Sequence, residues 1–341
     1  MMCKKIKNIS ISVTDNCFFK CEMCSMWKNK SKTKLPSLKQ YDLLFKDLQK
    51  IQTKSLFVSF TGGEPLIVPG IYELIKLANK YNFLTNLNTN GWLINNKIIK
   101  KLFDSGLDFI VFSVDGSTAK LHDKIRGVAG SYEKIFWAIK NLKNYYKMNN
   151  KSIQVEISTV INALNLHDIE NIVNLAEKNK NIGRMKFQSI ASSLLTGNDI
   201  NEKSYYNFQT GKNKYWFENE SYKHLWPTDK KRLLDLFTNL IILRRKSNKF
   251  TNSESYFKMQ HNYFLHPEVR MSNITCSVNN NLNIFTNGDI LHCCPKHEVI
   301  GNICDNRLKD LLKLDDTKRF LNNIKNCNLN CHHLINCIPE N

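Results

Sequence analysis

Three cysteines lie within eight residues near the start of the sequence. Cys17, Cys21 and Cys24 have the spacing C-x3-C-x2-C in the segment DNCFFKCEMCSMW, directly after a strand-like run. Thiolates bind soft or borderline metals, so the expected occupant is an iron–sulfur cluster or zinc. A structural zinc site needs four ligands, whereas three thiolates on a four-iron cluster leave one iron open to a small chelating molecule. Zinc, or buried thiols that act as small hydrophobic side chains, are the alternatives.

Polar groups also follow later strand-like runs. TGGEP offers two glycines that let backbone approach a ligand and a carboxylate for an ammonium group. SVDGS offers groups for hydroxyls, and HDKIRG offers an arginine for a carboxylate. A plain turn, a helix cap or a solvated arginine would look the same when each motif is taken alone. The candidate binding residues are Gly62, Gly63, Glu64, Asn90, Ser113, Asp115, Arg126 and Asn165.

The elements that must position these residues alternate along the first 190 residues. Strands are predicted at 6–13, 55–60, 83–88, 108–114, 153–161 and 184–190. Helical periodicity lies between them, for example at 41–51, 71–81, 131–142 and 166–178. Six successive βα units predict a parallel sheet, wound openly or into a barrel, with ligands at the C-terminal ends of its strands.

The alternation ends near residue 191, which suggests three parts. Residues 1–190 form the α/β core, and 191–270 form a connecting region with one helix at about 229–246. Residues 271–341 form a small cysteine-rich domain around a hairpin at 281–294 and a helix-rich segment at 307–326. Any catalytic acid or base in the connecting region is not readable from the sequence.

Composition narrows the function classes. The net charge is 49 − 30 = +19 with a pI near 9.4, but the excess is mostly lysine spread along all 341 residues, so nucleic acid is not the expected partner. No apolar stretch approaches a membrane span and no secretory segment is evident, so we expect a cytoplasmic protein. In a reducing cytosol, eleven cysteines at short spacings favour metal binding over disulfides.

Taken together, the motifs resemble the radical S-adenosylmethionine (SAM) superfamily. CFFKCEMC, TGGEP, TNG, SVDGS, HDKIRG and an asparagine before the fifth helix occur in the order typical of that family, over about residues 6–190. The resemblance implies a partial (β/α)6 TIM-like barrel and a [4Fe-4S] cluster on the three cysteines, whose free iron is chelated by the amine and carboxylate of SAM. Reductive cleavage of SAM would then give a 5′-deoxyadenosyl radical that takes a hydrogen atom from the substrate.

The same resemblance assigns roles to the strand-end residues. The TGGEP residues Gly62, Gly63 and Glu64 would hold the SAM amine. Ser113 and Arg126 would hold its carboxylate. Asp115 and Asn165 would contact the ribose or nearby polar atoms, and Asn90 would be a further cofactor contact. Two departures from the family pattern are Met23, where an aromatic residue is usual, and the lack of a glycine-rich adenine motif after the fifth strand.

The cysteines near the end of the sequence resemble the SPASM and twitch domains, which carry auxiliary clusters in many radical SAM enzymes. Five cysteines compete for the four positions of an auxiliary [4Fe-4S] cluster: Cys276, Cys293, Cys327, Cys331 and Cys337. We favour the first four, with Cys294 as a close substitute for Cys293. Since only four residues follow the last cysteine, we expect one auxiliary cluster. A zinc ribbon that uses His332 and His333 is the alternative, and Cys3 and Cys304 fit neither site.

These features predict a radical SAM oxidoreductase or maturase. The first strand begins near residue 6, without an N-terminal peptide-recognition extension, so we expect a small molecule such as a carbohydrate to be dehydrogenated with the help of the auxiliary cluster. A peptide substrate that is crosslinked or epimerised is the second possibility, and a non-catalytic zinc-binding module is the contrasting class. The reducing electron would come from a flavodoxin- or ferredoxin-like protein.

Overall fold

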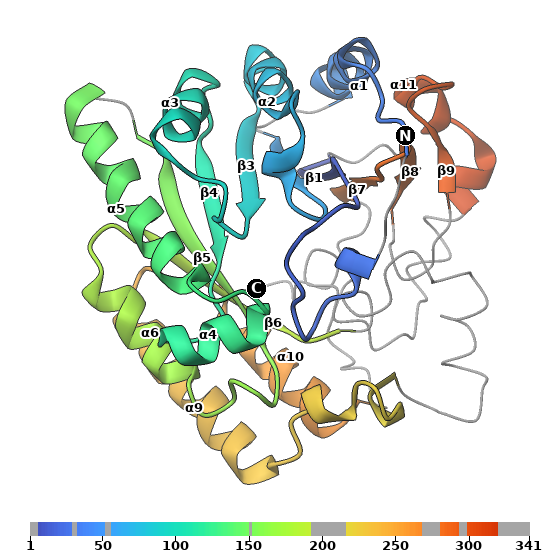
Figure 1. Ribbon diagram of the computed structural model, residues 1–341. Coiled ribbons are helices and arrows are strands. Elements are labelled where there is room, and N and C mark those ends of the chain that lie inside the picture. The colour runs from blue at the N-terminus through green and yellow to red at the C-terminus, as the bar shows by residue number, and fades with distance from the viewer. Residues whose placement is uncertain are drawn as a thin grey trace.

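The structure of the chain is a computed structural model. It describes residues 6–28, 33–51, 56–149, 152–191, 216–267, 280–292 and 299–319. Within these ranges nine strands form one sheet, in the order β6-β5-β4-β3-β2-β1-β7-β8-β9, with helices along one side of it (Figure 1).

The first six strands pair in parallel, each with the next along the chain. They are β1 (Asn8–Ser12), β2 (Phe57–Thr61), β3 (Leu84–Thr89), β4 (Phe109–Ser113), β5 (Gln154–Ile161) and β6 (Arg184–Ser189). Each lies within or overlaps a predicted strand, so the predicted α/β fold with a parallel, partial-barrel sheet is confirmed.

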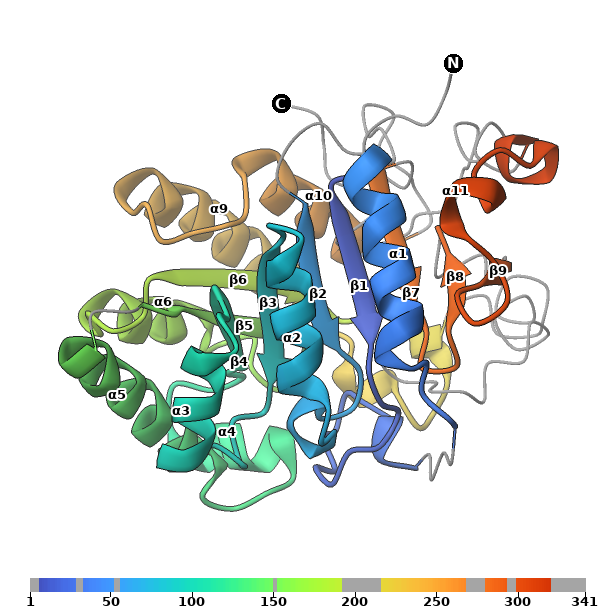
Figure 2. The same ribbon diagram turned by 90° about the horizontal axis from the view of Figure 1, so that it is seen from above.

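Six helices cover one side of these strands (Figures 1 and 2). They are α1 (Leu38–Ile51), α2 (Ile71–Lys80), α3 (Asn96–Asp104), α4 (Ala119–Arg126), α5 (Ser131–Asn149) and α6 (Ile169–Lys178). Asn95 caps α3 by accepting a hydrogen bond from the N–H of Ile98, and Thr118 caps α4 through Leu121. Asn165 does not cap α6, because its side chain bonds elsewhere.

The two faces of the parallel strands differ in chemistry. In β1, buried Ile9 and Ile11 alternate with the polar residues Asn8, Ser10 and Ser12. Because successive side chains of a strand point to opposite faces, the apolar set packs under the helices and the polar set lies on the other face, here called the inner face. Strand register places these further residues on the inner face: Ser59, Asn86, Asn88, Ser113, Glu156, Ser158, Arg184, Lys186 and Gln188.

The connecting region contains more helix than the sequence indicated. Helix α9 (Lys230–Lys246) matches the prediction, but a second helix, α10 (Glu254–Leu265), lies where no helix was predicted. Six of the twelve α10 residues are buried, and their spacing places them on one face of the helix. Because two tyrosines and Gln260 are among them, this face is less apolar than a typical amphipathic stripe. Phe257 packs against Phe187 on the outer face of β6, with ring centroids 6.5 Å apart.

The predicted hairpin near the C-terminal part of the chain extends the same sheet. β7 (Asn281–Ile284) and β8 (Asp289–Leu291) form the hairpin, followed by β9 (Val299–Asn302) and α11 (Leu308–Leu311). β7 also pairs in parallel with β1, and the Asn8 side chain donates a 2.9 Å hydrogen bond to that of Asn281. The division into three parts stays a prediction, but β7 is hydrogen-bonded directly to the barrel sheet.

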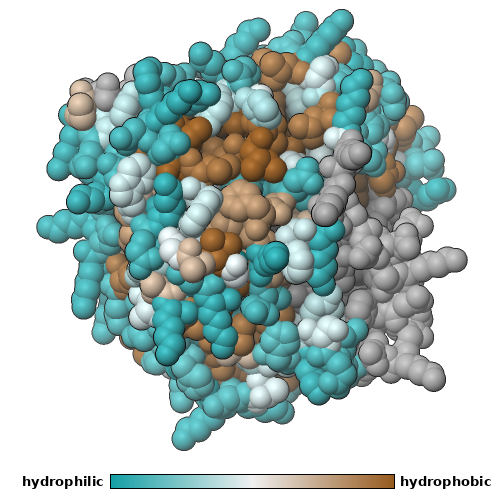
Figure 3. All heavy atoms as spheres, in the orientation of Figure 1, coloured by the Kyte–Doolittle hydropathy of each residue, from teal (hydrophilic) through white to brown (hydrophobic). Residues whose placement is uncertain are grey.

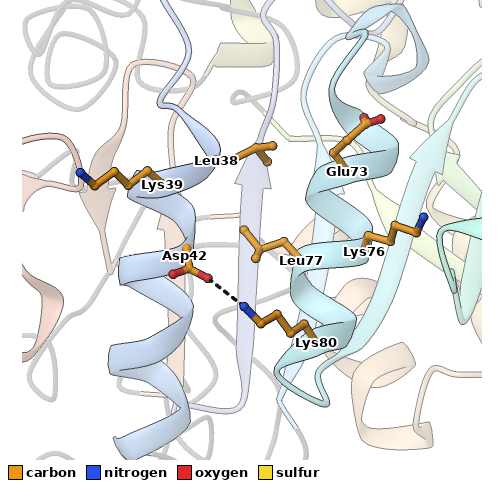
Figure 4. Close-up of a pocket in the computed structure, with 7 residues that line it drawn as sticks. All are labelled: Leu38, Lys39, Asp42, Glu73, Lys76, Leu77 and Lys80. Carbon is orange, nitrogen blue, oxygen red and sulfur yellow. Dashed lines mark ion pairs between the residues drawn. The ribbon is translucent and has the colours of Figure 1, made fainter.

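Among the residues described, no helix is long and apolar enough to cross a membrane. A shallow groove of about 560 Å³ lies between α1 and α2, on the helical side of the sheet (Figure 4). Its lining residues are Leu38, Lys39, Asp42, Glu73, Lys76, Leu77 and Lys80. Because the groove is on the outer side, it is separate from the strand ends and the inner face.

Candidate active site

The loop after β1 carries the three predicted cluster ligands at the C-terminal end of the strand. Cys21 is buried, and Cys17 and Cys24 are half-buried. The N–H of Cys24 donates to the carbonyl of Cys21 at 3.2 Å, which closes a turn between these two residues. The structure therefore brings the three thiols onto one compact loop at the mouth of the sheet.

The end of α4 supports this loop from one side. The N–H of Glu22 donates to the carbonyl of Ile125 at 2.9 Å. Gly127 ends α4 with a φ of 70°, and a Cβ there would lie 2.4 Å from the carbonyl oxygen of Lys20. Only glycine allows both the positive φ and this close approach.

The glycines of TGGEP support the loop from the other side. The N–H of Gly63 donates to the carbonyl of Thr14 at 2.7 Å, and that of Glu64 donates to Asn16 at 2.9 Å. A Cβ on Gly62 would lie 2.2 Å from the Thr14 oxygen, and one on Gly63 would lie 2.0 Å from the Asn16 oxygen. We expected these glycines to admit a ligand. In the structure they first admit the backbone that leads into the first cysteine.

Glu64 joins the ends of β2 and β3. Its carboxylate accepts hydrogen bonds from the Leu66 N–H at 3.1 Å, the Thr89 hydroxyl at 2.8 Å and the Asn90 N–H at 2.8 Å. Burial raises the pKa of Glu64, although these hydrogen bonds oppose the shift. The side-chain Nδ2 of Asn90 is buried without a hydrogen-bond partner among the described residues, so it is a donor available to a ligand.

Asp115 plays the same part at the end of β4. Its carboxylate accepts from the Val160 N–H at 2.8 Å and pairs with Nη1 of Arg126 at 3.1 Å. Burial raises its pKa, although Arg126 opposes the shift. The N–H of Asp115 donates to Nδ1 of His122 at 3.2 Å. Nε of Arg126 is buried with no hydrogen-bond partner in the described chain.

Asn165 and Ser113 differ in whether their side chains are available to a ligand. Asn165 is fully buried, its Nδ2 donates to the carbonyls of Asp115 at 3.2 Å and Val160 at 3.0 Å, and its Oδ1 accepts from the Asn162 N–H at 3.0 Å. Ser113 is half-buried and lies on the inner face. Asn165 therefore braces the strand ends, whereas Ser113 is open to a ligand.

The electrostatic environment of the thiols is dominated by burial and by one cation. Burial raises the pKa of Cys21 to about 12, although Arg126 opposes the shift, and burial also raises the pKa values of Cys17 and Cys24. Burial acts against the charge of Arg126, but the three cysteines and Asp115 raise its pKa overall. Without metal the sulfurs stay protonated, so metal binding must release protons beside Arg126.

The C-terminal hairpin reaches the segment that precedes the cysteine loop. The hydroxyl of Thr286, after β7, donates to the buried carboxylate of Asp15 at 2.6 Å. A cavity of about 200 Å³ lies beside this contact. Its lining residues are Thr14, Asp15, Asn16, Thr33, Leu35, Ile67, Val68, Pro69 and Thr286. The hairpin is thus packed against the candidate site.

The predicted auxiliary ligands cannot be placed in the same way. Cys276, Cys293, Cys327, Cys331 and Cys337, with the substitute Cys294, all lie outside the described residues. Their assignment stays a prediction. Cys304 is described, and it is exposed and forms no disulfide. In the described ranges, no three His, Cys, Asp or Glu side chains are grouped so as to hold a single metal ion.

Two kinds of residue at the site were not predicted. Phe18 and Trp92 are both more than a third exposed, and Phe19 packs edge-on against each of them. Figure 3 shows apolar side chains gathered in the middle of the face that Figure 1 presents. The charged residues on the inner face of β5 and β6 were also missed, although the alternation in RMKFQS (184–189) was a readable signal.

The fold and the site together define an incomplete parallel α/β barrel with a cysteine loop at the mouth of its first strand. Residues 11–176 match the model of the radical SAM superfamily, so the chain contains a radical SAM domain. Enzymes of this superfamily use a [4Fe-4S] cluster and SAM.

Similar proteins include enzymes with different products. The AdoMet-dependent heme synthase of Oleidesulfovibrio alaskensis is 32% identical over 120 residues, which cover 35% of this chain and 29% of that protein. The GTP 3′,8-cyclase of Clostridium perfringens is 32% identical over 183 residues, covering 52% of this chain and 53% of that protein. The chain therefore spans between about a third and about half of these relatives.

A solved structure has the same fold over most of the chain. SuiB of Streptococcus suis, bound to S-adenosylmethionine, gives a TM-score of 0.63 at 20% identity and covers 91% of this chain and 66% of its own. At this identity the likeness concerns the fold alone.

The side chains at the mouth fit the cofactors of the superfamily. Cys17, Cys21 and Cys24 are three soft donors on one loop, which is the donor set of an open four-iron cluster. Arg126 Nε and Asn90 Nδ2 are buried donors whose partners are absent from the described residues, so they suit the carboxylate and polar atoms of an amino-acid ligand.

Proposed function

We propose that the chain cleaves SAM reductively and removes a hydrogen atom from a small polar molecule, which is thereby dehydrogenated with the help of an auxiliary [4Fe-4S] cluster. The observation that carries the proposal is the three-cysteine loop, held between the glycines of β2 and the end of α4 beside Arg126. When bound, the cluster and SAM supply an electron and a 5′-deoxyadenosyl radical. A flavodoxin- or ferredoxin-like protein would deliver the electron.

The residues of the mouth divide into ligands and supports. Cys17, Cys21 and Cys24 would hold the cluster, and the unpartnered Nε of Arg126 would donate to the SAM carboxylate. The backbone carbonyls of Gly62 and Gly63 would accept hydrogen bonds from the SAM ammonium, and Ser113 and Asn90 would contact the remaining polar atoms.

Three predicted ligands act as supports in this proposal. The carboxylates of Glu64 and Asp115 and the amide of Asn165 are buried and hydrogen-bonded within the chain. They fix the ends of neighbouring strands, so the ligand groups are held in place before SAM binds.

The polar inner face supports a small polar substrate. The Ser59 hydroxyl accepts from the side-chain amides of Asn86 at 2.9 Å and Asn88 at 3.1 Å. Short amide and hydroxyl side chains suit hydroxyl groups of a substrate, because they both donate and accept hydrogen bonds.

A peptide substrate is the second candidate. SuiB has also been solved with the precursor peptide SuiA bound, at a TM-score of 0.61 and 19% identity to this chain. Crosslinking or epimerisation of a peptide would use the same radical step, so the two candidates differ in substrate and outcome, not in cofactor.

Anaerobic reconstitution with iron, sulfide, a reductant and SAM tests the proposal. We expect brown protein with about eight irons per chain, as two [4Fe-4S] clusters require, and formation of 5′-deoxyadenosine. Joint replacement of Cys17, Cys21 and Cys24 by Ala should abolish 5′-deoxyadenosine, whereas Cys304→Ala, at an exposed cysteine, should leave it unchanged. Colourless protein that binds zinc would instead support the non-catalytic module.

The auxiliary cluster has its own test. Joint replacement of Cys327 and Cys331 by Ala should lower the iron content by about half and leave SAM cleavage measurable. An unchanged iron content would remove the auxiliary site from the proposal.

A further inference from the structure

The inner face of β5 and β6 carries a cluster of three charged side chains. Glu156, Arg184 and Lys186 lie on this face by strand register. Their neighbours Met185 and Phe187 are fully buried on the opposite face. The charged set therefore lies on the side of the sheet that also carries the Asn and Ser side chains.

The cluster has one positive charge in excess. Nε of Arg184 pairs with Oε2 of Glu156 at 3.1 Å, and the Arg184 guanidinium lies over the ring of Phe109 at 5.2 Å. No carboxylate of the described chain lies within 4.0 Å of the Lys186 ammonium. Burial lowers the pKa of Lys186, although Glu156 opposes the shift. A cation that is partly buried without a counter-charge is unfavourable unless a ligand supplies one.

The surroundings of Lys186 suit the oxygen atoms of an anion. Lys186 pairs in register with Ser158, which in turn pairs with Ser113, and all three lie on the inner face. The Ser158 hydroxyl lies 3.4 Å from Oε1 of Gln188 on the same face. Since Ser113 is a proposed contact of SAM, an anion at Lys186 would be two strands away from the cofactor along one row.

A second inner-face group points independently to a ligand. Asn86 on β3 is 8% exposed. Its Nδ2 donates to Ser59, but its buried Oδ1 has no hydrogen-bond partner in the described residues. Buried amide oxygens are normally satisfied, so this one suits a hydroxyl or amine donor of a bound molecule.

We infer that the inner face binds the anionic group of the substrate, a carboxylate or a phosphate, at Lys186, with Arg184 beside it and Asn86 as an acceptor for a donor group elsewhere on the molecule. The inference rests on the proposed function, which it deepens by naming the substrate class as a polar anion. Glu156 tunes the site. Its negative charge offsets the positive charge of Arg184, which lowers the affinity of the site for anions.

Titration of the reconstituted full-length protein tests the inference without SAM or reductant. Inorganic phosphate and succinate serve as probes, with binding followed by calorimetry at constant ionic strength. We expect saturable binding of at least one probe, weakened at least tenfold in Lys186→Gln, partly restored in Lys186→Arg and strengthened in Glu156→Gln. The exposed Lys178→Gln carries the same charge change and should bind as the unaltered protein does.

Each outcome decides the inference. Preference for phosphate identifies a phosphorylated substrate, and preference for succinate identifies a carboxylic acid. Equal binding by the Lys186→Gln and Lys178→Gln proteins, or weaker binding by Glu156→Gln, overturns the site, and so does the lack of saturable binding. Failure of the unaltered protein to form 5′-deoxyadenosine would overturn the proposed function instead, so the two failures are distinguishable.

Discussion

The strand ends and the inner face of the sheet are both polar, but they use their polar atoms differently. At the strand ends, Glu64, Asp115 and Asn165 are buried and hydrogen-bonded to neighbouring segments of the chain. On the inner face, Lys186 has no close counter-charge in the described chain and Asn86 keeps an unused buried oxygen.

This difference separates scaffold groups from binding groups, and the unpartnered Asn90 Nδ2 and Arg126 Nε at the strand ends belong to the second kind. A buried polar group that is satisfied by the chain stabilises the fold and fixes geometry, whereas one that is left unsatisfied is a cost that a ligand removes. Substitutions should therefore be destabilising at Asp115, where the buried group is satisfied, and nearly neutral at Lys186, where it is not. The following predictions test that contrast.

The largest effect is expected at Asp115. Asp115→Ala leaves the buried Arg126 without its ion pair, so we expect the free energy of unfolding of the metal-free protein to fall by about 3–5 kcal/mol. Urea denaturation measures the change. Asp104→Ala, which breaks the exposed pair with Lys100, is the control and should cost no more than about 0.5 kcal/mol. Equal effects of the two substitutions would contradict the scaffold role.

His122 gives the strand ends a pH dependence. Burial lowers the pKa of His122 to about 3, with Arg126 adding to the shift. The folded state therefore resists protonation that the unfolded state accepts, and the stabilisation present above pH 6.5 is lost as the pH falls towards 3. In His122→Asn, the new amide oxygen can still accept a hydrogen bond from the Asp115 N–H. The free energy of unfolding should then fall less steeply with falling pH, and the two slopes should differ by roughly 1.4 kcal/mol per pH unit.

Unfolding free energies of the unaltered and His122→Asn proteins, measured between pH 6.5 and 4, check this prediction. Parallel pH profiles would show that the imidazole takes up its proton in the folded state.

A smaller loss is expected at Gly63. In Gly63→Ala the new Cβ must displace the backbone of Asn16, which should cost about 1–3 kcal/mol and lower iron loading, because Asn16 adjoins Cys17. Iron content and thermal unfolding measure the two effects. The matched control is Gly70→Ala, since a Cβ at Gly70 meets nothing within 4 Å. Normal iron loading in Gly63→Ala would separate the glycine from the cluster loop.

The smallest effect is expected on the inner face. Lys186→Met removes a partly buried charge and keeps the length of the side chain, so the free energy of unfolding without ligand should be unchanged or higher by about 1 kcal/mol. Urea denaturation at pH 7 is again the measurement. A clear loss of stability would place Lys186 with the scaffold and erase the contrast between the two regions.

The sequence predicts the parallel strands well because most have either a short apolar run before a turn motif, as FVSF before TGGEP, or a strict alternation, as in NISIS and RMKFQS. It also locates the cysteine loop and the residues at the strand ends. It does not show that Asn165 bonds to Asp115, because the two residues are 50 positions apart and meet only through the alignment of β4 with β5.

Two further features were beyond the sequence for physical reasons. Helix α10 buries one face, but Gln260 and two tyrosines lie on that face, so the apolar periodicity in the sequence is weak. The parallel partner of Asn281–Ile284 is β1, and a strand of four residues carries no local signal for a partner 273 positions away.

That last pairing has a consequence for how the chain is made. β1 leaves the ribosome well before its partner β7, so one of its edges stays open until residues 281–284 have been synthesised. At common translation rates of about 5–20 residues per second, the delay is roughly 15–60 s. An unpaired edge is a template for wrong partners during that time, so the nascent chain is exposed to misassembly at the strand that leads into its cysteine loop.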